Sequence, residues 1–145
     1  MNTRESDLRR KRESIVQAHE EAENRGDVDA TLATFGGRPR YDVIPGGIFD
    51  GAEEVGDLLR GIFAAIPDFR ATTLKLYHAD DAVIVESRTT GTHTGGEWFG
   101  IPPAGHRMEM RAISIYEFDG DRMTCEKLFF DGMLLQQQLL GEVES

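Results

Sequence analysis

The sequence predicts an α+β protein in which three N-terminal helices pack against a strongly curved antiparallel sheet, forming a cone-shaped barrel with a pocket at its open end. The predicted helices lie in the first 66 residues, apart from a short one at the end of the chain, and from Phe69 the apolar residues recur with a period of two. Helices that precede a run of long strands pack on one face of the sheet. Because such a sheet twists and curls, its covered concave face is left open at one end.

The bulk composition fits one soluble domain over residues 1–145. A net charge of −10 argues against nucleic acid as a partner, and the basic cluster 9–12 is typical of a solvated helix face. No apolar run approaches the roughly 20 residues that cross a bilayer, so no membrane is expected. A charged N-terminus without an apolar signal region and a single cysteine, Cys125, favour the cytoplasm.

Three helices are predicted before the sheet. Ser6 is a suitable N-cap for a first helix that ends near Arg25, and Asp27 caps a short second one. Residues 50–53 have the spacing of a capping box for a third helix. Apolar residues then recur at i, i+3, i+4 and i+7 until Pro67 stops the helix, which makes this the clearest amphipathic segment of the chain.

The strands are predicted from alternation and turn residues. Residues 41–44 form a short strand, followed by a Pro-Gly-Gly turn into Ile48 and Phe49. Asp80-Asp81 and Asp119-Gly120 are hairpin turns, and a short helix closes the chain. The long strands are expected over residues 71–78, 82–92, 107–118 and 122–130.

The segment GTHTGGEWFGIPPAG, residues 91–105, joins two of these long strands. Its density of glycine and proline excludes a strand interior and predicts an ordered loop. The loop holds His93 at its start, and Trp98 and Phe99 at its tip. Because binding residues concentrate on loops carried by a rigid scaffold, these two aromatics are expected to cover an apolar ligand or to bury against a second subunit.

Asp131 and His93 are the candidate catalytic residues. Asp131 follows the apolar run Leu128-Phe129-Phe130, where desolvation would make a carboxyl group a useful general acid or base. The alternative, which the residues alone favour, is an N-cap for the last helix. His93 is either a proton carrier in the pocket or a histidine bonded to loop backbone.

The candidate substrate-binding residues come from the strands and the central loop. Arg111 could hold an anionic oxygen with Glu126 orienting it, or could form an ordinary cross-strand ion pair. One bulge in the last strand would exchange Glu126 for Lys127 in the pocket. No metal-ligand spacing and no nucleotide fingerprint is present, so neither a metal nor another cofactor is expected. The full set is Tyr41, Asp42, Trp98, Phe99, Arg111, Ser114, Tyr116, Glu126 and Phe129.

Two stretches carry a resemblance to a known family. The loop GTHTG…FGIPPAG and the closing run Glu126-Lys-Leu-Phe-Phe-Asp131 resemble the SnoaL-like polyketide cyclases, ester cyclase subgroup, of the nuclear transport factor 2-like (NTF2-like) superfamily. The resemblance implies the cone-shaped fold and an acid–base role for Asp131. Gly95-Gly96 lengthens the loop, and Leu128 and Phe129 stand where the family often has Trp or Tyr.

The expected function is therefore a cofactor-independent cyclase or isomerase for a hydrophobic, polyketide-like carbonyl compound, acting through an enolate and aldol-type closure. One alternative is a non-catalytic module of the same fold that binds a small molecule or dimerises. Another is an epoxide hydrolase-like enzyme in which Asp131 activates water. A homodimer is expected, packed through outer-face residues such as Ile113, Ile115 or Leu128.

Overall fold

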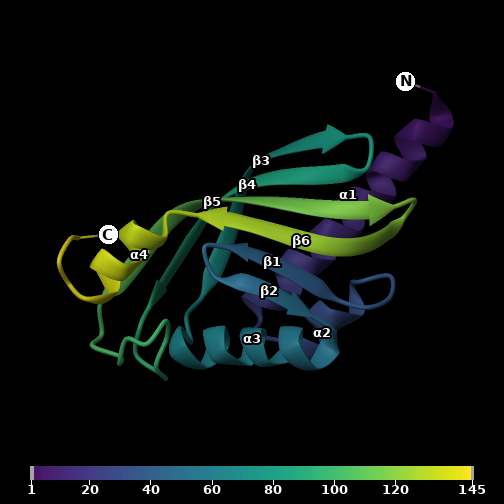
Figure 1. The fold of residues 1–145 in the computed structure, drawn as a ribbon. Coiled ribbons are helices and arrows are strands. Elements are labelled where there is room, and N and C mark those ends of the chain that lie inside the picture. Colours follow the sequence, from purple (N-terminus) through teal and green to yellow (C-terminus); the bar gives the residue numbers. More distant parts are fainter. Residues whose placement is uncertain (1, 145) are drawn as a thin grey trace.

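The computed structural model describes residues 2–144 and contains four helices and six strands in that range (Figure 1). Within it, none of the helices combines the length and apolar character that crossing a bilayer requires. The elements in chain order are α1 (Thr3–Asn24), α2 (Val28–Ala33), β1 (Arg40–Ile44), β2 (Gly47–Asp50), α3 (Ala52–Ala65), β3 (Arg70–Ala79), β4 (Ala82–Thr92), β5 (Arg107–Asp119), β6 (Arg122–Phe130) and α4 (Gly132–Leu139).

The six strands form one curved sheet in the order β2-β1-β6-β5-β4-β3, with α1 and α3 against one face (Figure 1). The predicted α+β class is confirmed, with two differences. The sheet is open, because β2 and β3 are edge strands. One pair is parallel, since β1 lies beside β6 with Tyr41 opposite Glu126. Alternation predicts a strand and its buried face, but not which strand lies beside it.

The helix starts differ from the predicted caps by a few residues. Asn2, and not Ser6, caps α1 by accepting a hydrogen bond from the backbone of Glu5. Gly51 occupies the N-cap position of α3 with φ of 94°. The carboxylate of Glu54, one residue beyond the predicted Glu53, accepts from the Asp50 backbone at 2.9 Å. Gly51 has a positive φ, which glycine adopts readily, and it takes the N-cap position predicted for Asp50. The partner glutamate therefore also moves by one residue, from Glu53 to Glu54.

Arg12 ties α1 to the turns of both hairpins and is not part of a solvated face. Its side chain is buried, and it donates 2.9 Å hydrogen bonds to the carbonyl oxygens of Gly120 and Asp80. The guanidinium also lies 5.4 Å from the ring centroid of Phe118. These contacts hold the middle of α1 against the sheet and thereby position the next two turns, which carry the polar groups of the pocket.

A bulge in β6 turns Glu126 toward the helices. Glu117 of β5 lies opposite Cys125, whereas Phe118 lies opposite Met123, so Thr124 is an extra residue in β6. Beyond the bulge, Glu126 lies opposite Tyr116 and shares the covered face with it. The bulge therefore has the opposite effect to the one expected: without the extra residue the period of two would turn Lys127 inward, and with it Glu126 lines the pocket.

The central loop is anchored on the C-terminal end of α3. The backbone amides of Gly95 and Gly96 donate to the carbonyl oxygens of Ala65 at 3.0 Å and Ala64 at 3.2 Å. These carbonyls lie in the last turn of the helix, where no further helical amide is available. The loop therefore closes one end of the molecule and brings Trp98 and Phe99 over the space between α3 and the sheet.

Candidate active site

A pocket lies between the sheet and the helices. Most of its wall is apolar or aromatic, with a small set of polar groups at one place, the usual composition of a small-molecule site. The apolar wall comes mainly from α3, β5, β6 and the central loop. The polar lining residues are Glu20, Glu23, Tyr41, Ser87, Thr89, Ser114, Tyr116 and Glu126.

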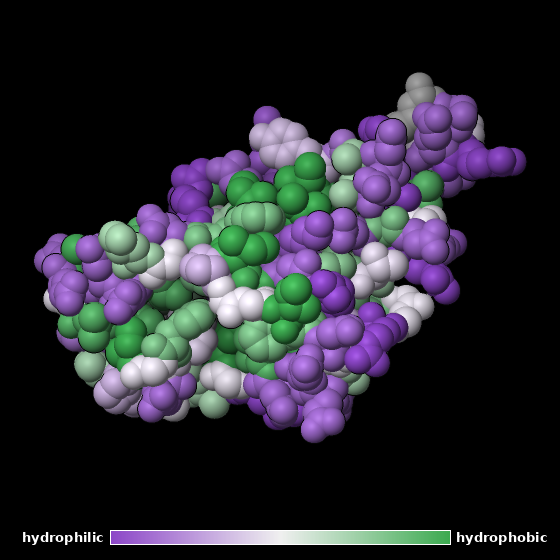
Figure 2. All heavy atoms as spheres, viewed as in Figure 1, coloured by the Kyte–Doolittle hydropathy of each residue, from purple (hydrophilic) through white to green (hydrophobic). Residues whose placement is uncertain are grey.

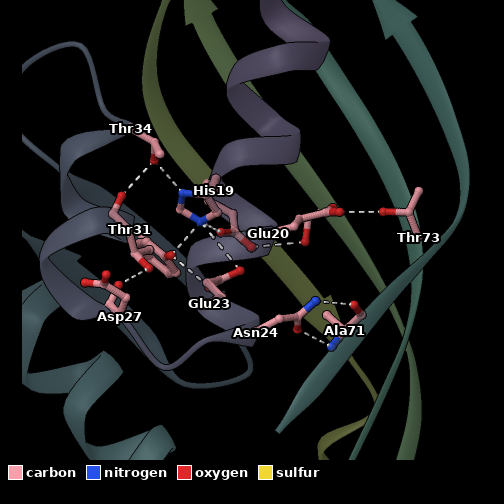
Figure 3. Close-up of polar contacts among 12 residues, drawn as sticks. His19, Glu20, Glu23, Asn24, Asp27, Thr31, Thr34, Ala71 and Thr73 are labelled. Carbon is pink, nitrogen blue, oxygen red and sulfur yellow. Dashed lines mark hydrogen bonds and ion pairs between the residues drawn. The ribbon is translucent and has the colours of Figure 1, made fainter.

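His19 connects these polar groups from behind the wall (Figure 3). It is fully buried on α1, and its Nε2 lies 2.9 Å from Oε1 of Glu126 and 2.8 Å from the hydroxyl of Tyr41. The same nitrogen is 3.6 Å from Oε1 of Glu23, one helical turn further along α1. Ser114 donates a 3.0 Å hydrogen bond to the other oxygen of Glu126. His19 on α1 and Ser114 on β5 thus fix the carboxyl group of Glu126 on β6.

The hydrogen-bond pattern fits a His19 with protons on both nitrogens. The Thr34 hydroxyl donates to the carbonyl oxygen of Thr31, so its oxygen accepts the 2.7 Å bond from Nδ1. The Tyr41 hydroxyl donates to Glu23 at 3.0 Å, so its oxygen accepts from Nε2. A hydroxyl has one proton to donate. An imidazolium between the carboxylates of Glu23 and Glu126 satisfies all of these contacts.

The pKa values agree with this arrangement. Burial alone would lower the pKa of His19, but the carboxylates of Glu23 and Glu126 outweigh it and raise the pKa to about 10. Burial and the negative charge of Glu23 raise the pKa of Glu126, although hydrogen bonds from His19 and Ser114 oppose the change. The cluster thus favours a charged His19, and Glu126 takes up a proton more readily than an exposed glutamate does.

Six of the predicted site residues line this pocket: Tyr41, Trp98, Phe99, Ser114, Tyr116 and Glu126. The ring centroids of Trp98 and Phe99 lie 5.1 Å apart with the rings tilted by 48°, and the ring centroids of Phe99 and Phe130 lie 6.3 Å apart. Phe99 is half exposed and has φ of 51°, an uncommon value for a residue with a side chain. The two aromatics form the rim where the pocket meets solvent.

Neither predicted catalytic residue belongs to the pocket lining. Asp131 is exposed and caps α4, accepting a 3.0 Å hydrogen bond from the backbone of Leu134. His93 is buried in the loop base, where Nε2 donates to the carbonyl oxygen of Gly96 at 2.7 Å. For both residues the structure shows the alternative placement, a helix cap and a loop anchor. Asp131 stays outside because Phe130 faces the pocket and the chain turns away after it.

Three predicted binding residues also lie elsewhere. Arg111 is on the outer sheet face, paired with Glu86 on the neighbouring strand. Asp42 pairs with Arg40 at 3.0 Å. Phe129 is 39% exposed on the outer face, because strand alternation places its neighbours Leu128 and Phe130 in the pocket wall.

The sequence reasoning missed His19, Glu20 and Glu23. A signal was present, since His19 falls on the same stripe of α1 as buried Val16 and Ala22. Glu23 follows at i+4, on the same side of the helix. A histidine on a buried helix stripe needs a polar partner, and the bulge supplies it in Glu126.

These side chains could also hold a metal ion. His19, Glu23 and Glu126 each offer a ligand atom, and the three atoms lie within 4.8 Å of one another. The sequence spacing did not predict this cluster, because Glu126 is 107 positions from His19 in the chain. A metal would have to displace the proton on Nε2 of His19 and its bond to Tyr41, so the residues as hydrogen-bonded here fit an ion pair better.

Comparison with solved structures shows that the chain has an NTF2-like fold. A protein from Jannaschia provisionally assigned as a SnoaL-like polyketide cyclase superposes with a TM-score of 0.81 at 16% identity, covering 89% of this chain and 91% of its own. A provisionally assigned polyketide cyclase from Acidithiobacillus ferrooxidans gives 0.73 at 27%, covering 92% and 96%. An NTF2-like protein of unknown function from Burkholderia pseudomallei gives 0.75 at 18%, covering 89% and 97%.

The family follows from the sequence match. The model of the SnoaL-like polyketide cyclase family matches residues 13–139, nearly the whole chain, so the protein belongs to that family. Among curated proteins, no significant sequence match was found. Family and fold support a role of the cyclase or isomerase type.

Proposed function

We propose that the protein is a cofactor-independent cyclase or isomerase that moves protons on a hydrophobic carbonyl compound, with Glu126 as the general acid and base. The observation that carries this proposal is the carboxyl group of Glu126, only 3% exposed, in the pocket wall between the His19 imidazolium and the Ser114 hydroxyl. A desolvated carboxyl group with a raised pKa is suited to proton transfer near neutral pH.

In the proposed reaction, the Glu126 carboxylate removes a proton alpha to the carbonyl group and an enolate forms. Tyr116 lies opposite Glu126 on β5 and would donate a hydrogen bond to the enolate oxygen. Burial and the charges of Glu126 and Glu23 raise the pKa of Tyr116, which keeps its phenol protonated. The enolate carbon attacks a second carbonyl of the substrate, an aldol-type closure, and Glu126 returns the proton to the new alkoxide.

The test is exchange of the alpha protons of 2-tetralone for deuterium, followed by proton NMR in D₂O. We expect the wild-type protein to accelerate exchange and Glu126→Gln to lose that acceleration by about 100-fold or more. Asp131→Asn is the matched control, because its exposed amide can still cap α4. Loss of exchange in Asp131→Asn with retention in Glu126→Gln would return the catalytic role to Asp131.

A non-catalytic binding module is the second candidate. The position of Asp131 as an exposed helix cap favours it, whereas the polar wall around Glu126 does not. If the wild-type protein bound 2-tetralone but gave no exchange above buffer, the binding module would be the better proposal. Epoxide opening by water that Asp131 activates is not supported, because Asp131 is not part of the pocket lining.

We also propose a homodimer packed through the outer sheet face. Ile44, Phe129 and Ile113 lie opposite one another across three neighbouring strands and are each about 40% exposed. Figure 2 shows hydrophobic residues gathered on the face turned to the viewer. Leu128, expected on this face, lines the pocket instead. We expect a dimer by light scattering at micromolar concentration and a monomer for Ile113→Glu; a monomeric wild-type protein would contradict this.

A further inference from the structure

The charged side chains of the pocket wall all have the same sign. Glu20 and Glu23 of α1 and Glu126 of β6 line the pocket, and among the described residues no lysine or arginine does. Within residues 2–144, the only cationic side chain in contact with these carboxylates is His19, behind the wall. When all four groups are ionised, the imidazolium balances one carboxylate and leaves two negative charges without a counter-ion.

The carboxylates of Glu20 and Glu23 on α1 have fewer hydrogen-bond donors around them than their oxygens can accept. One oxygen of Glu20 accepts a hydrogen bond from the Thr73 hydroxyl. One oxygen of Glu23 accepts from Tyr41, and the other is 3.6 Å from His19. Burying carboxylates without a counter-ion is unfavourable. Burial and the charges of Glu23 and Glu126 accordingly raise the pKa of Glu20, so this part of the wall favours uptake of a positive charge.

The aromatic and aliphatic part of the pocket wall favours an organic cation over a small hydrated ion. Phe69, Trp98 and Phe130 line the pocket together with aliphatic side chains. A small hydrated ion gains nothing from such a wall. An organic cation buries its apolar part there, and its ammonium group is attracted to the faces of aromatic rings.

We propose that the natural ligand carries a protonated amine on an apolar body, with the ammonium group beside Glu20 and Glu23. This rests on the proposed function and narrows its substrate to an amine-bearing carbonyl compound. When Glu126 takes up the alpha proton, its negative charge moves to the enolate, so the pocket keeps its excess of negative charge throughout the step, and the ammonium group offsets part of it. The two carboxylates of α1 are thereby assigned a role in recognition, separate from proton transfer at Glu126.

The test compares three ligands of one shape: 4-phenylbutylamine, 4-phenylbutanol and 4-phenylbutyrate, titrated calorimetrically at pH 7. We expect the amine to bind at least tenfold more tightly than the alcohol, and the carboxylate to bind weakest. In Glu20→Gln the preference for the amine should fall several-fold, with the affinity for the alcohol unchanged. Glu21→Gln is the matched control, since this neighbour on α1 is exposed and outside the pocket lining.

Other outcomes would overturn the proposal and separate it from the proposed function. Equal affinity for amine and alcohol would refute the cationic ligand and leave the pocket and its chemistry intact. Failure of every ligand to bind, together with no exchange of 2-tetralone, would refute both. Tight binding of Zn²⁺ alone that Glu23→Gln abolishes would assign the excess negative charge to a metal ion instead.

Discussion

Gly95→Ala is expected to unfold at a melting temperature about 10 °C below that of the wild-type protein, a loss of more than about 3 kcal/mol. A Cβ atom at this position would lie 1.6 Å from the carbonyl oxygen of Ala64, a backbone atom that cannot rotate away. The loop would have to leave the end of α3, losing the amide hydrogen bonds of Gly95 and Gly96 to that helix.

Gly96→Ala is the control for this prediction. A Cβ atom on Gly96 meets nothing within 4 Å, so the change removes backbone freedom without a clash. Differential scanning calorimetry of the two variants separates the effect of the steric clash from the effect of the lost backbone freedom. Equal melting temperatures would show that the loop does not dock closely on α3.

Stability is expected to fall as the pH rises from about 6.5 toward 10, because of His19. Its pKa is about 10 in the folded protein and about 6.5 in an unfolded chain. The folded state therefore holds this proton more tightly, and the resulting stabilisation is complete below pH 6.5 and lost as the pH passes 10. The pKa values of Glu20 and Glu126 are also raised in the folded protein, so these two groups likewise make the protein less stable as the pH rises. Their effect begins at a lower pH than that of His19.

His19→Gln tests the origin of this pH dependence. The amide keeps hydrogen-bonding capacity but leaves Glu23 and Glu126 without their counter-ion, a loss on the order of 3–5 kcal/mol at pH 7. Urea unfolding at several pH values should show the wild-type slope between pH 7 and 10 and a much flatter one for the variant. His78→Gln, which alters a histidine paired with exposed Glu13, should keep the wild-type slope. If His19→Gln kept the wild-type slope, the imidazolium of His19 would not be the source of this pH dependence.

Local features of the fold could be predicted because each depends on a few neighbouring residues. The amphipathic period of α3 ends at Pro67, and Asp27 caps α2 as expected. One hairpin turns at the expected Asp80-Asp81, and the other turns at Gly120-Asp121, one residue beyond the expected Asp119-Gly120. The family match over residues 13–139 agrees with the resemblance seen in the central loop and the closing run.

The candidate site was predicted only in part, since it depends on which faces meet. Ser114 and Tyr116 were placed in the pocket correctly because β5 alternates without interruption. Asp131 was chosen for its apolar neighbours in sequence, but the chain turns outward after Phe130 and leaves it as a cap. His19 was not among the predicted site residues, because its partner Glu126 is 107 positions away in the chain.

The sequence by itself determined the α+β class, the family, the order of the helices and long strands, and an acidic chain with an aromatic loop. These follow from periodicity, turn residues and motifs, which are local. Only the tertiary structure decided that β1 lies parallel to β6, that the bulge at Thr124 turns Glu126 inward, and that α1 brings His19 and Glu23 to it. A bulge reverses which face every later residue occupies, and helix docking joins residues far apart in the chain. No local pattern encodes either outcome.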